Sequence, residues 1–512
     1  MRRRMGRGRT RRAAAAALFA IVVVSGLLAG CSHATPQEMD ACPSNCREDP
    51  DSEESFDTSY AAPDLVGASV DATVPDTHGR DAVGREPDLG DDTATATMSD
   101  VVFQQSPCTP KFPTPAAKNC AKPPKCFDVQ SGEAGSFFSS VVHWKGGYVA
   151  VGATGAGVKR ASITFVDCHG KIGPEVVCSQ ATSSWQSALL VTSGMLLVGI
   201  VEASSNGSLG LIASSPASGQ APWSHAVSAA KKPNTGVELL GVAETDGLIA
   251  AVGWQGPVKL ASAIEVGGAA DRDALAIGLT LAGDLLWQSR HPVVDMYRQV
   301  TAAGDGGFVA AGYDSDGQVR GCVVHISKTG TPDWHHCHEP QQIHSSLAFA
   351  TTAAVVVDGT RVIAAGGVSS SLIVHFWRAA LVTYPQIPGK PTYTIPEGAG
   401  AKKAESYMPG TDIYDIELGK DGRIVWAGRF WSAGSTPPLP AYKWDHASTV
   451  HVIDNESKLV HVWNRGNGPS GLQQIRRSAW GGYVAVGWRQ KMNEPDRAWM
   501  VKLPDEDTPT CP

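Results

Sequence analysis

One seven-residue word occurs twice in this chain, and this repetition restricts the possible folds more than any other feature. The word GGYVAVG ends on Gly152 and again on Gly487, and the variant GGFVAAG ends on Gly312. Similar runs end on seven glycines in all, which are Gly152, Gly199, Gly253, Gly312, Gly366, Gly428 and Gly487. The intervals are 47, 54, 59, 54, 62 and 59 residues. Seven repeated units explain how so long a region folds, because a single core stops growing at about 250 to 300 residues.

Each unit is predicted to contain four short strands. A second apolar strand and a turn follow every glycine-ended run, and several of these turns place an aromatic residue four positions after a glycine. The pairs are Gly219 with Trp223, Gly283 with Trp287, Gly330 with Trp334 and Gly389 with Tyr393. Glycine permits the positive φ of a hairpin turn, and the aromatic residue lies on the returning strand, where it can cover the neighbouring unit.

The strands are apolar on both faces. In GGYVAVG, Tyr148 and Ala150 point to one side of the sheet, and Val149 and Val151 point to the other. Sheets of this kind must be covered on both sides by neighbouring sheets. The pattern predicts an all-β fold, a seven-bladed β-propeller of four-stranded antiparallel blades. The expected blades are 136–182, 183–230, 236–291, 296–340, 343–397, 411–465 and 471–512 plus 121–131.

The two ends of this region are expected to close the ring together. The seventh unit lacks an outer strand, whereas KCFDVQ (Lys125–Gln130) is an extended segment without a partner. We therefore predict that this segment completes the last blade. Cys511 would then lie close to one of three upstream cysteines, Cys108, Cys120 or Cys126.

Units such as GGFVAAGYDSDGQVRGCVVHISKTGTPDW resemble the repeats of bacterial exported propellers related to the quinoprotein-like and Kelch-like groups. The resemblance extends from Phe137 to Leu503 and implies the fold, but such propellers have many unrelated roles. A quinoprotein dehydrogenase would show adjacent cysteines near its cofactor, and the sequence contains no Cys-Cys pair. It also contains no GxSxG, HExxH or phosphate-loop motif. We expect no cofactor, no metal and no enzymatic activity.

The N-terminus has the pattern of an export signal. Seven arginines in the first twelve residues precede an apolar run from Ala13 to Leu28, which is short for a membrane-spanning helix. The run ends in LLAGC, which resembles the lipobox of bacterial lipoproteins and implies cleavage before Cys31 with lipid, including palmitate, on that residue. An ordinary signal peptide with a chance cysteine is the alternative. Residues 1–30 are thus assigned to the signal peptide.

Residues 31–105 are expected to form a disordered acidic tether. Positions 32–100 carry 17 acidic residues against 3 arginines, and such a composition cannot bury enough apolar surface to fold. The remaining 412 residues contain 33 basic and 33 acidic side chains. This neutral balance argues against a nucleic-acid partner, which would require an excess of basic residues.

Cysteines and histidines are given structural roles. Removing Cys31 leaves ten cysteines, an even number that is consistent with disulfides in an exported chain. The candidate pairs are Cys42 with Cys46, Cys168 with Cys178, and Cys322 with Cys337, and Cys511 is expected to pair with Cys126 or with one of the other two upstream cysteines named above. In WHHCH (Trp334–His338), strand alternation places His336 and His338 on one face and His335 and Cys337 on the other, so a metal site is not expected.

A ligand-binding surface is expected on one face of the ring. The connections between second and third strands are long at 254–273, 367–378, 429–447 and 488–497, and these connections emerge on the same face as those between blades. The candidate binding residues there are Trp377, Phe430, Trp431, Tyr442 and Trp444; alternatively, these side chains only pack the loops down.

The sequence therefore favours a monomeric lipoprotein that displays a non-enzymatic binding module for an envelope protein or a carbohydrate. Ser32 after Cys31 favours the outer membrane in an organism with two membranes. One alternative is a scaffold that resembles the propeller lipoprotein of the outer-membrane barrel assembly machinery, although that protein usually has eight repeats. A quinoprotein dehydrogenase is the other.

Overall fold

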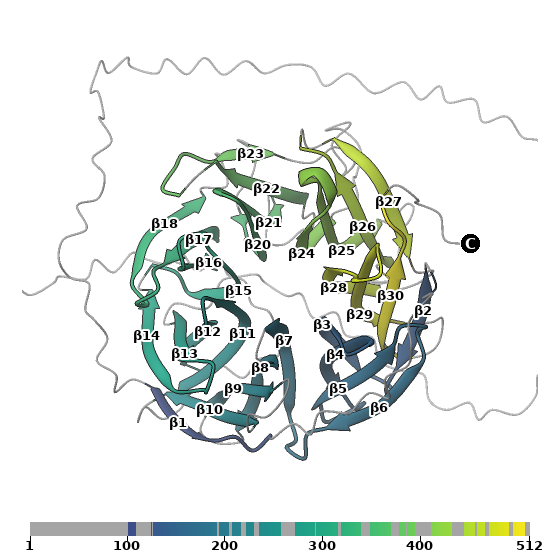
Figure 1. Ribbon diagram of the computed structural model, residues 1–512, viewed down its shortest axis with the longest axis horizontal. Coiled ribbons are helices and arrows are strands. Elements are labelled where there is room, and N and C mark those ends of the chain that lie inside the picture. The colour runs from purple at the N-terminus through teal and green to yellow at the C-terminus, as the bar shows by residue number, and fades with distance from the viewer. Residues whose placement is uncertain are drawn as a thin grey trace, which may run out of the picture. The chain divides into compact units, whose positions relative to one another are not determined.

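The chain folds into a ring of seven antiparallel sheets around a central axis (Figure 1). The computed structural model describes residues 101–108, 124, 126–191, 194–203, 207–216, 222–229, 235–257, 272–291, 293–315, 319–338, 349–369, 378–385, 387–394, 411–432, 445–455, 458–465, 470–490 and 495–506. These residues form 30 strands and one 3-10 turn, η1 (Lys420–Gly422). None of the helical structure among them is long and apolar enough to cross a membrane. The predicted seven-bladed β-propeller is confirmed.

The first four blades follow the expected order, with the innermost strand first. Blade 1 contains β3 (Phe137–Trp144), β4 (Gly147–Thr154), β5 (Arg160–Asp167) and β6 (Ile172–Val177). Blade 2 contains β7 (Ser183–Val191), β8 (Gly194–Ala203), β9 (Gly207–Pro216) and β10 (Trp223–Ala229). Blade 3 contains β11 (Thr235–Thr245), β12 (Leu248–Pro257), β13 (Asp273–Thr280) and β14 (Leu285–His291). Blade 4 contains β15 (Met296–Ala302), β16 (Phe308–Asp314), β17 (Arg320–Ile326) and β18 (Pro332–His338).

The last three blades complete the ring. In blade 5, β19 (Phe349–Ala350) and β20 (Ala354–Asp358) both pair with β21 (Arg361–Ser369), and β22 (Arg378–Tyr384) and β23 (Thr392–Thr394) follow. Blade 6 contains β24 (Thr411–Leu418), β25 (Ile424–Ser432), β26 (Asp445–Ile453) and β27 (Leu459–Arg465). Blade 7 contains β28 (Ser470–Arg477), β29 (Tyr483–Arg489), β30 (Arg497–Leu503) and, on its outer edge, β2 (Phe127–Ser131).

The pairing of β2 with β30 confirms that both ends of the propeller region build blade 7. The two strands are antiparallel, with Val129 opposite Met500. On β2, Asp128 accepts a hydrogen bond of 2.9 Å from the indole Nε1 of Trp499 and one of 2.8 Å from Arg489. The closing strand is therefore held by side-chain bonds as well as by the strand ladder.

The boundary expected at residue 105 is wrong, because β1 (Val101–Gln105) belongs to the folded region. This strand pairs antiparallel with β10 and forms a fifth strand on the outer edge of blade 2. Val101 is buried, and Phe103 packs edge-on against His225 with ring centroids 5.3 Å apart. The alternation in VVFQQ supplies one apolar face, which a composition averaged over the acidic segment conceals.

The glycine that ends each repeated word is required by a bulge in the strand beside it. In six blades the innermost strand contains one extra residue, and the residue before this bulge pairs with the repeated glycine. A Cβ on Gly312 would lie 1.9 Å from the carbonyl oxygen of Met296. On Gly152, Gly253 or Gly487 it would lie no more than 2.0 Å from the corresponding oxygen. Only glycine fits at this close backbone approach.

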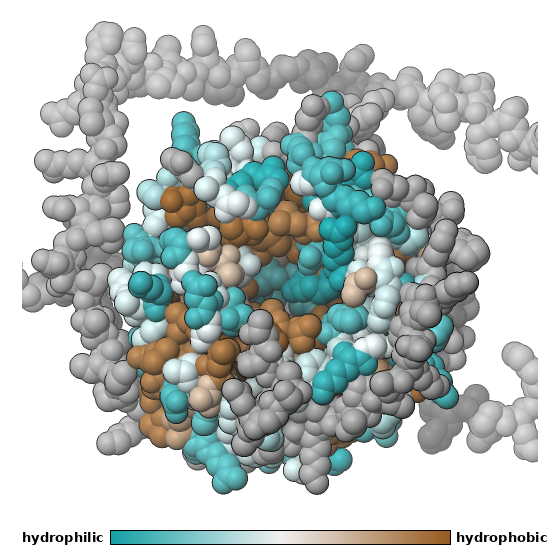
Figure 2. All heavy atoms as spheres, in the orientation of Figure 1, coloured by the Kyte–Doolittle hydropathy of each residue, from teal (hydrophilic) through white to brown (hydrophobic). Residues whose placement is uncertain are grey.

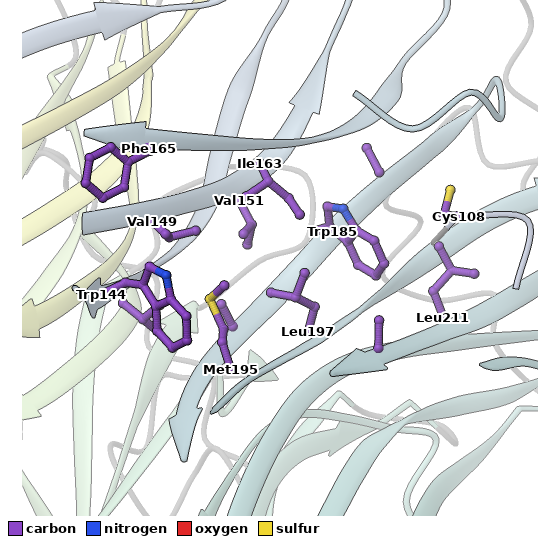
Figure 3. Packing of buried hydrophobic residues seen from close by; sticks show 14 of the residues in the cluster. Cys108, Trp144, Val149, Val151, Ile163, Phe165, Trp185, Met195, Leu197 and Leu211 are labelled. Atoms are coloured by element: carbon purple, nitrogen blue, oxygen red, sulfur yellow. The ribbon is translucent and has the colours of Figure 1, made fainter. Parts of the chain in front are cut away.

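Apolar side chains fill the space between blades. Between blades 1 and 2, Val149 and Val151 of β4 contact a layer formed by Trp185 of β7 and Leu197 of β8 (Figure 3). All four are almost fully buried. Burying a side chain of this size contributes about 1.5–3 kcal/mol, so the two-sided apolar strands hold neighbouring blades together.

The Gly-x-x-x-Trp turns join neighbouring blades, as expected. Trp287 on the outer strand of blade 3 covers Gly330 in the β17–β18 turn of blade 4, where an added Cβ would meet the ring at 2.4 Å. Its Nε1 donates a 3.0 Å hydrogen bond to the carbonyl of Lys328. Trp223 of blade 2 covers Gly283 of blade 3 in the same way. At the closure, Phe127 of β2 takes this position over Gly170 of blade 1, with an added Cβ at 2.8 Å.

The expected disulfide between Cys322 and Cys337 is present, because these residues are directly opposite each other on β17 and β18. The expected pairing of Cys168 with Cys178 is wrong. Cys168 lies at the turn of the β5–β6 hairpin, whereas Cys178 follows the far end of β6 and its backbone nitrogen donates to the carbonyl of Ala161. The two cysteines are thus at opposite ends of the same hairpin.

Cys178 instead bonds Cys108, which follows β1, across a sequence separation of 70 residues. This bond ties the segment after β1 to blade 1 and removes Cys108 from the possible partners of Cys511. Cys126 and Cys168 are disulfide-bonded as well. Cys31, Cys42, Cys46 and Cys511 lie outside the described residues.

Candidate ligand-binding site

The bulges of the innermost strands mark the mouth of the propeller. Their extra residues are Ser139, Gln186, Leu240, Arg298, Tyr414 and Gln473. A bulge turns one side chain out of the regular alternation of its strand. The space-filling view shows the centre of the ring hollowed, with hydrophilic residues in its depth and hydrophobic residues at parts of its border (Figure 2).

Three of the bulge residues, from consecutive blades, line one cavity. Gln473 of blade 7, Ser139 of blade 1 and Gln186 of blade 2 contribute to a cavity of about 330 Å³. Its other walls are Gly135, Ser136, Phe137, Lys159, Trp488 and Asp496. Gly135 and Ser136 precede β3, Lys159 lies between β4 and β5, and Asp496 lies between β29 and β30, while Phe137 begins β3 and Trp488 is near the end of β29. The cavity therefore opens on the face of the ring that carries the long connections. We call this the upper face and this cavity the seam cavity.

Opposite charges meet at the rim of the seam cavity. The Lys159 ammonium donates a hydrogen bond to the carbonyl of Gly135, whose backbone nitrogen bonds the carbonyl of Asp496 at 2.6 Å. Burial lowers the pKa of Lys159, and the nearby Asp496 carboxylate opposes this effect. The Lys159 ammonium also lies 5.9 Å from the ring centroid of Phe137. The two charges compensate each other and leave the cavity close to neutral.

The polar side chains inside the seam cavity differ in how many of their hydrogen-bonding groups already have a partner in the protein. Ser139 Oγ lies 3.0 Å from the carbonyl oxygen of Val151 and 2.5 Å from that of Trp185, so this hydroxyl holds blades 1 and 2 together. The amide nitrogen of Gln186 donates to Ser184 at 2.6 Å, which leaves its oxygen as an acceptor. Within the described part of the chain, the Gln473 amide has no hydrogen-bond partner. The cavity therefore offers amide donors and acceptors to a ligand.

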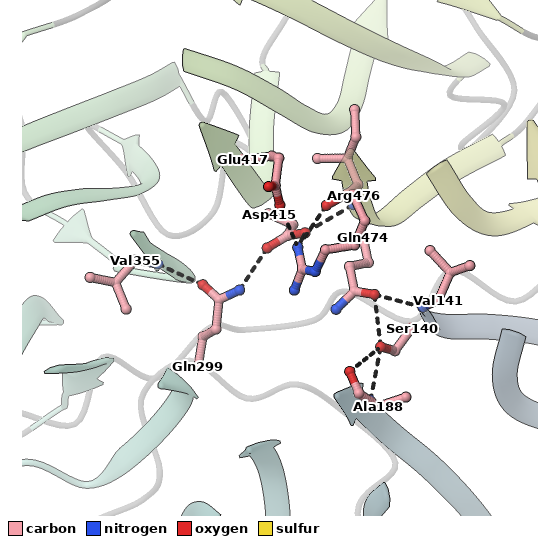
Figure 4. A network of polar contacts seen from close by, with 10 residues as sticks. Ser140, Val141, Ala188, Gln299, Val355, Asp415, Glu417, Gln474 and Arg476 are labelled. Atoms are coloured by element: carbon pink, nitrogen blue, oxygen red, sulfur yellow. Dashed lines mark hydrogen bonds and ion pairs between the residues drawn. The ribbon is translucent and has the colours of Figure 1, made fainter. Parts of the chain in front are cut away.

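Below the mouth, a belt of hydrogen bonds links inner strands around the axis (Figure 4). Gln474 Oε1 accepts from Ser140 Oγ at 2.7 Å and from the backbone nitrogen of Val141 at 2.6 Å, which joins blade 7 to blade 1. Ser140 in turn accepts from the nitrogen of Ala188 in blade 2 at 2.9 Å. These side chains satisfy backbone groups of the next blade, so the belt is structural.

The belt continues through a buried carboxylate. Asp415 accepts from the nitrogen of Ile475 at 2.9 Å and from the amide of Gln299 at 2.7 Å, and it pairs with Arg476 at 2.5 Å. Burial raises the pKa of the adjacent Glu417 to about 7, although Arg476 acts in the opposite direction. This cluster is fully engaged in joining blades 4, 6 and 7.

The WHHCH strand follows the predicted alternation. His336 and His338 face blade 5, where they contact Tyr393 and Tyr384, while His335 faces His291 of blade 3 with ring centroids 4.8 Å apart. Burial lowers the pKa of His338 to about 3, so this side chain is neutral at physiological pH. No three His, Cys, Asp or Glu side chains in the described ranges are grouped so that they could hold a metal ion.

The binding residues expected from the sequence remain predictions. Trp377, Tyr442 and Trp444 lie outside the described residues, and Phe430 and Trp431 belong to the end of β25, where the positions of the side chains are not described. Of the four long connections, the one from Trp488 to Arg497 contributes Trp488 and Asp496 to the seam cavity.

Sequence reasoning missed the bulge residues. The sequence feature that could have identified them is a nearly constant distance from the repeated glycine: Ser139 precedes Gly152 by 13 residues, and Gln473 precedes Gly487 by 14. Once the seven units are superimposed, this offset identifies one residue at the mouth in each bulged blade.

Comparisons with known proteins find distant likeness to solved structures. No family model matches the chain, and no curated protein matches it. Among solved structures, a streptogramin B lyase is similar with 12% identity and a TM-score of 0.42, over 73% of this chain and 97% of that one. The Neurospora crassa Pan2 WD40 domain gives 11% and 0.41, over 73% and 95%. A Trypanosoma rangeli sialidase in complex with sialic acid gives 10% and 0.38, over 74% of this chain and 59% of that one. Likeness at this level carries no argument about activity.

Proposed function

We propose that this chain is an exported lipoprotein whose propeller binds a ligand of the cell envelope through its upper face. Disulfides support an oxidising compartment, because they persist in exported proteins and are rare in the cytosol. The arginine-rich start, the apolar run and the LLAGC motif support lipid attachment at Cys31. Ser32 supports the outer membrane as the destination in an organism with two membranes.

The seam cavity is the observation that carries the binding role. It lies on the face of the ring where the connections vary most, and it joins two aromatic side chains to amides and a charged rim. Ligand sites in proteins are concave and combine apolar walls with a few placed polar groups. The amides and hydroxyls lining it suit binding rather than covalent chemistry, so the proposed module is not an enzyme.

The anchoring part of the proposal is tested at Cys31. The Cys31→Ser variant should lose incorporated palmitate and move from the membrane fraction to the soluble fraction. Cys42→Ser is the matched control, since it removes a cysteine from the same segment and should remain in the membrane fraction. Retention of Cys31→Ser in the membrane fraction with palmitate attached would contradict lipid anchoring at this residue.

The binding part is tested by photo-crosslinking in cells. Val158 is 53% exposed next to Lys159 on the upper face, whereas Leu286 is 45% exposed on the outer strand of blade 3. A photoreactive amino acid at Val158 should capture an envelope protein or glycan, and one at Leu286 should not. Barrel-assembly components at Val158 would favour the scaffold alternative. Equal labelling from the two positions would overturn the assignment to the upper face.

A further inference from the structure

The seam cavity is built from three consecutive blades. Gln473, Ser139 and Gln186 are the extra residues of bulges in blades 7, 1 and 2, so the same local device turns each of them toward one space. The equivalent residues elsewhere are Leu240 in blade 3, Arg298 in blade 4 and Tyr414 in blade 6. The side chains around the mouth thus differ from blade to blade, and the two bulge residues with amide side chains, Gln473 and Gln186, both line the seam cavity.

The hydrogen-bonding groups of the seam cavity match hydroxyl groups. A carboxamide both donates and accepts, as a hydroxyl does, and Gln473 has both functions free within the described residues. Gln186 adds an acceptor oxygen, because its nitrogen is bound to Ser184. A ligand with several hydroxyls can satisfy these groups at once.

The charges of the seam cavity select against an ionised ligand. Lys159 already donates to Gly135 and lies within electrostatic reach of Asp496. An anionic ligand would have to compete with the Asp496 carboxylate for the Lys159 ammonium, and a cationic ligand would have to compete with Lys159 for Asp496. Either ionised ligand would bring a second like charge into a partly desolvated site, which is unfavourable.

The remaining walls are aromatic. Phe137 precedes the bulge of β3, and Trp488 lies opposite Gly471, where the absence of a side chain leaves room for the indole beside the inner strand. Flat rings present large apolar surfaces at small entropic cost. The apolar C–H face of a sugar ring is complementary to such a surface, while its hydroxyl edges face the amides.

We propose that the seam cavity binds a neutral saccharide, as a free monosaccharide or disaccharide or as the end unit of a neutral glycan. Its volume of about 330 Å³ is at the low end for small-molecule sites, which fits a unit of this size. The assignment rests on the proposed function of the upper face, to which it adds the class of ligand.

The test uses the purified full chain and matched pairs of ligands. Glucose, N-acetylglucosamine, mannose and their β-linked or α-linked disaccharides are compared with glucuronic acid and glucosamine, by tryptophan fluorescence and saturation-transfer NMR. Binding of at least one neutral sugar is expected, about ten-fold tighter than that of its charged counterpart. Longer oligosaccharides of the same sugar distinguish the two sources. If the natural ligand is the end of a glycan, the oligosaccharide should bind more tightly than the monosaccharide; if it is a free sugar, the two should bind with equal affinity.

Variants locate the site. Gln473→Leu and Gln186→Leu should each weaken binding about ten-fold, in line with the loss of one ligand hydrogen bond. Arg298→Leu is the control, since it changes the bulge residue of blade 4, outside the cavity, and should leave affinity unchanged. Asp496→Asn should narrow the preference for glucose over glucuronic acid, because it removes the repelling charge and leaves the bonded carbonyl in place.

The outcomes separate the saccharide assignment from the wider proposal. If no neutral sugar binds while Val158 still captures a partner in cells, the saccharide assignment is overturned and the binding role stands. If sugars bind but Gln473→Leu and Gln186→Leu behave like Arg298→Leu, the site is elsewhere and the inference fails. If the Val158 crosslink is also absent, the proposed function itself is lost. A preference for charged sugars would overturn the charge argument.

Discussion

Replacing the repeated glycine of blade 4 tests the explanation for the repeat itself. In Gly312→Ala the new Cβ would lie 1.9 Å from the carbonyl oxygen of Met296, whereas Cβ contacts below 3.0 Å essentially never occur. The inner strand must therefore move by at least 1.1 Å, the difference of the two values. Overpacking of this kind costs about 1–3 kcal/mol, and each ladder hydrogen bond disturbed next to Tyr297 adds about 1 kcal/mol. The total expected loss is about 2–5 kcal/mol of the free energy of unfolding.

The assay is chemical denaturation followed by tryptophan fluorescence, with thermal unfolding as a second probe. Gly304→Ala is the matched control in the same blade, because the nearest atom to its Cβ, the carbonyl oxygen of Gly359, would be at 3.6 Å, an ordinary contact. The control should unfold within about 0.5 kcal/mol of the natural protein. If Gly312→Ala is as stable as Gly304→Ala, the bulge is not the reason for the repeated glycine.

Three further predictions concern packing, closure and pH. Trp287→Ala should destabilise the protein by about 2–4 kcal/mol, because the ring is only half-buried, and Trp287→Phe by about 1 kcal/mol through loss of the bond to Lys328. In thermal unfolding, a Trp287→Phe variant as stable as the natural protein would show that the hydrogen bond contributes nothing. Phe127→Ala should lower the unfolding temperature and increase proteolysis of the N-terminal strand, whereas unchanged proteolysis would argue against a closing role for this ring. The ring of His451 stacks on that of Trp426 with centroids 3.9 Å apart, and burial lowers the pKa of His451 to about 3. Because the unfolded chain takes up this proton at about pH 6.5, the free energy of unfolding should fall by about 1.4 kcal/mol per pH unit as the pH drops from 6.5 toward 3. His451→Phe keeps the stack and should flatten this part of the stability curve between pH 6 and 4; an unchanged slope would refute the assignment.

Much of the fold could be predicted because its determinants are local and repeated. The positions of strands follow from runs of about seven residues. Val149 and Ala150 point to opposite faces of one strand, and because both are apolar, both faces of the sheet must be covered by neighbouring sheets. The completion of blade 7 by the strand at Phe127 also follows from counting strands. What failed was the boundary at Val101, where a short alternating strand adjoins an acidic segment, and the pairing of Cys168, which depends on hairpin register.

The candidate site could be predicted only in part. The sequence indicated the upper face from the length of its connections, and one of these, beginning at Trp488, does reach the seam cavity. It gave no reason to single out Gln473 or Gln186. From the sequence alone, a polar residue in an inner strand could line the cavity or, like Gln474, form structural hydrogen bonds in the belt.

The sequence by itself determined that the chain forms seven two-sided sheets and that its ends share the last of them, since periodicity and strand count are properties of neighbouring residues. Only the tertiary structure decided which side chains meet. Ser140 and Gln474, 334 residues apart, share a hydrogen bond, and the bulge residues next to them converge on one cavity. Likewise, only the folded ring brings Cys108 to Cys178. Such meetings depend on the closure of the ring and on the exact position of each bulge, and both are set by the packing of whole blades rather than by any local pattern.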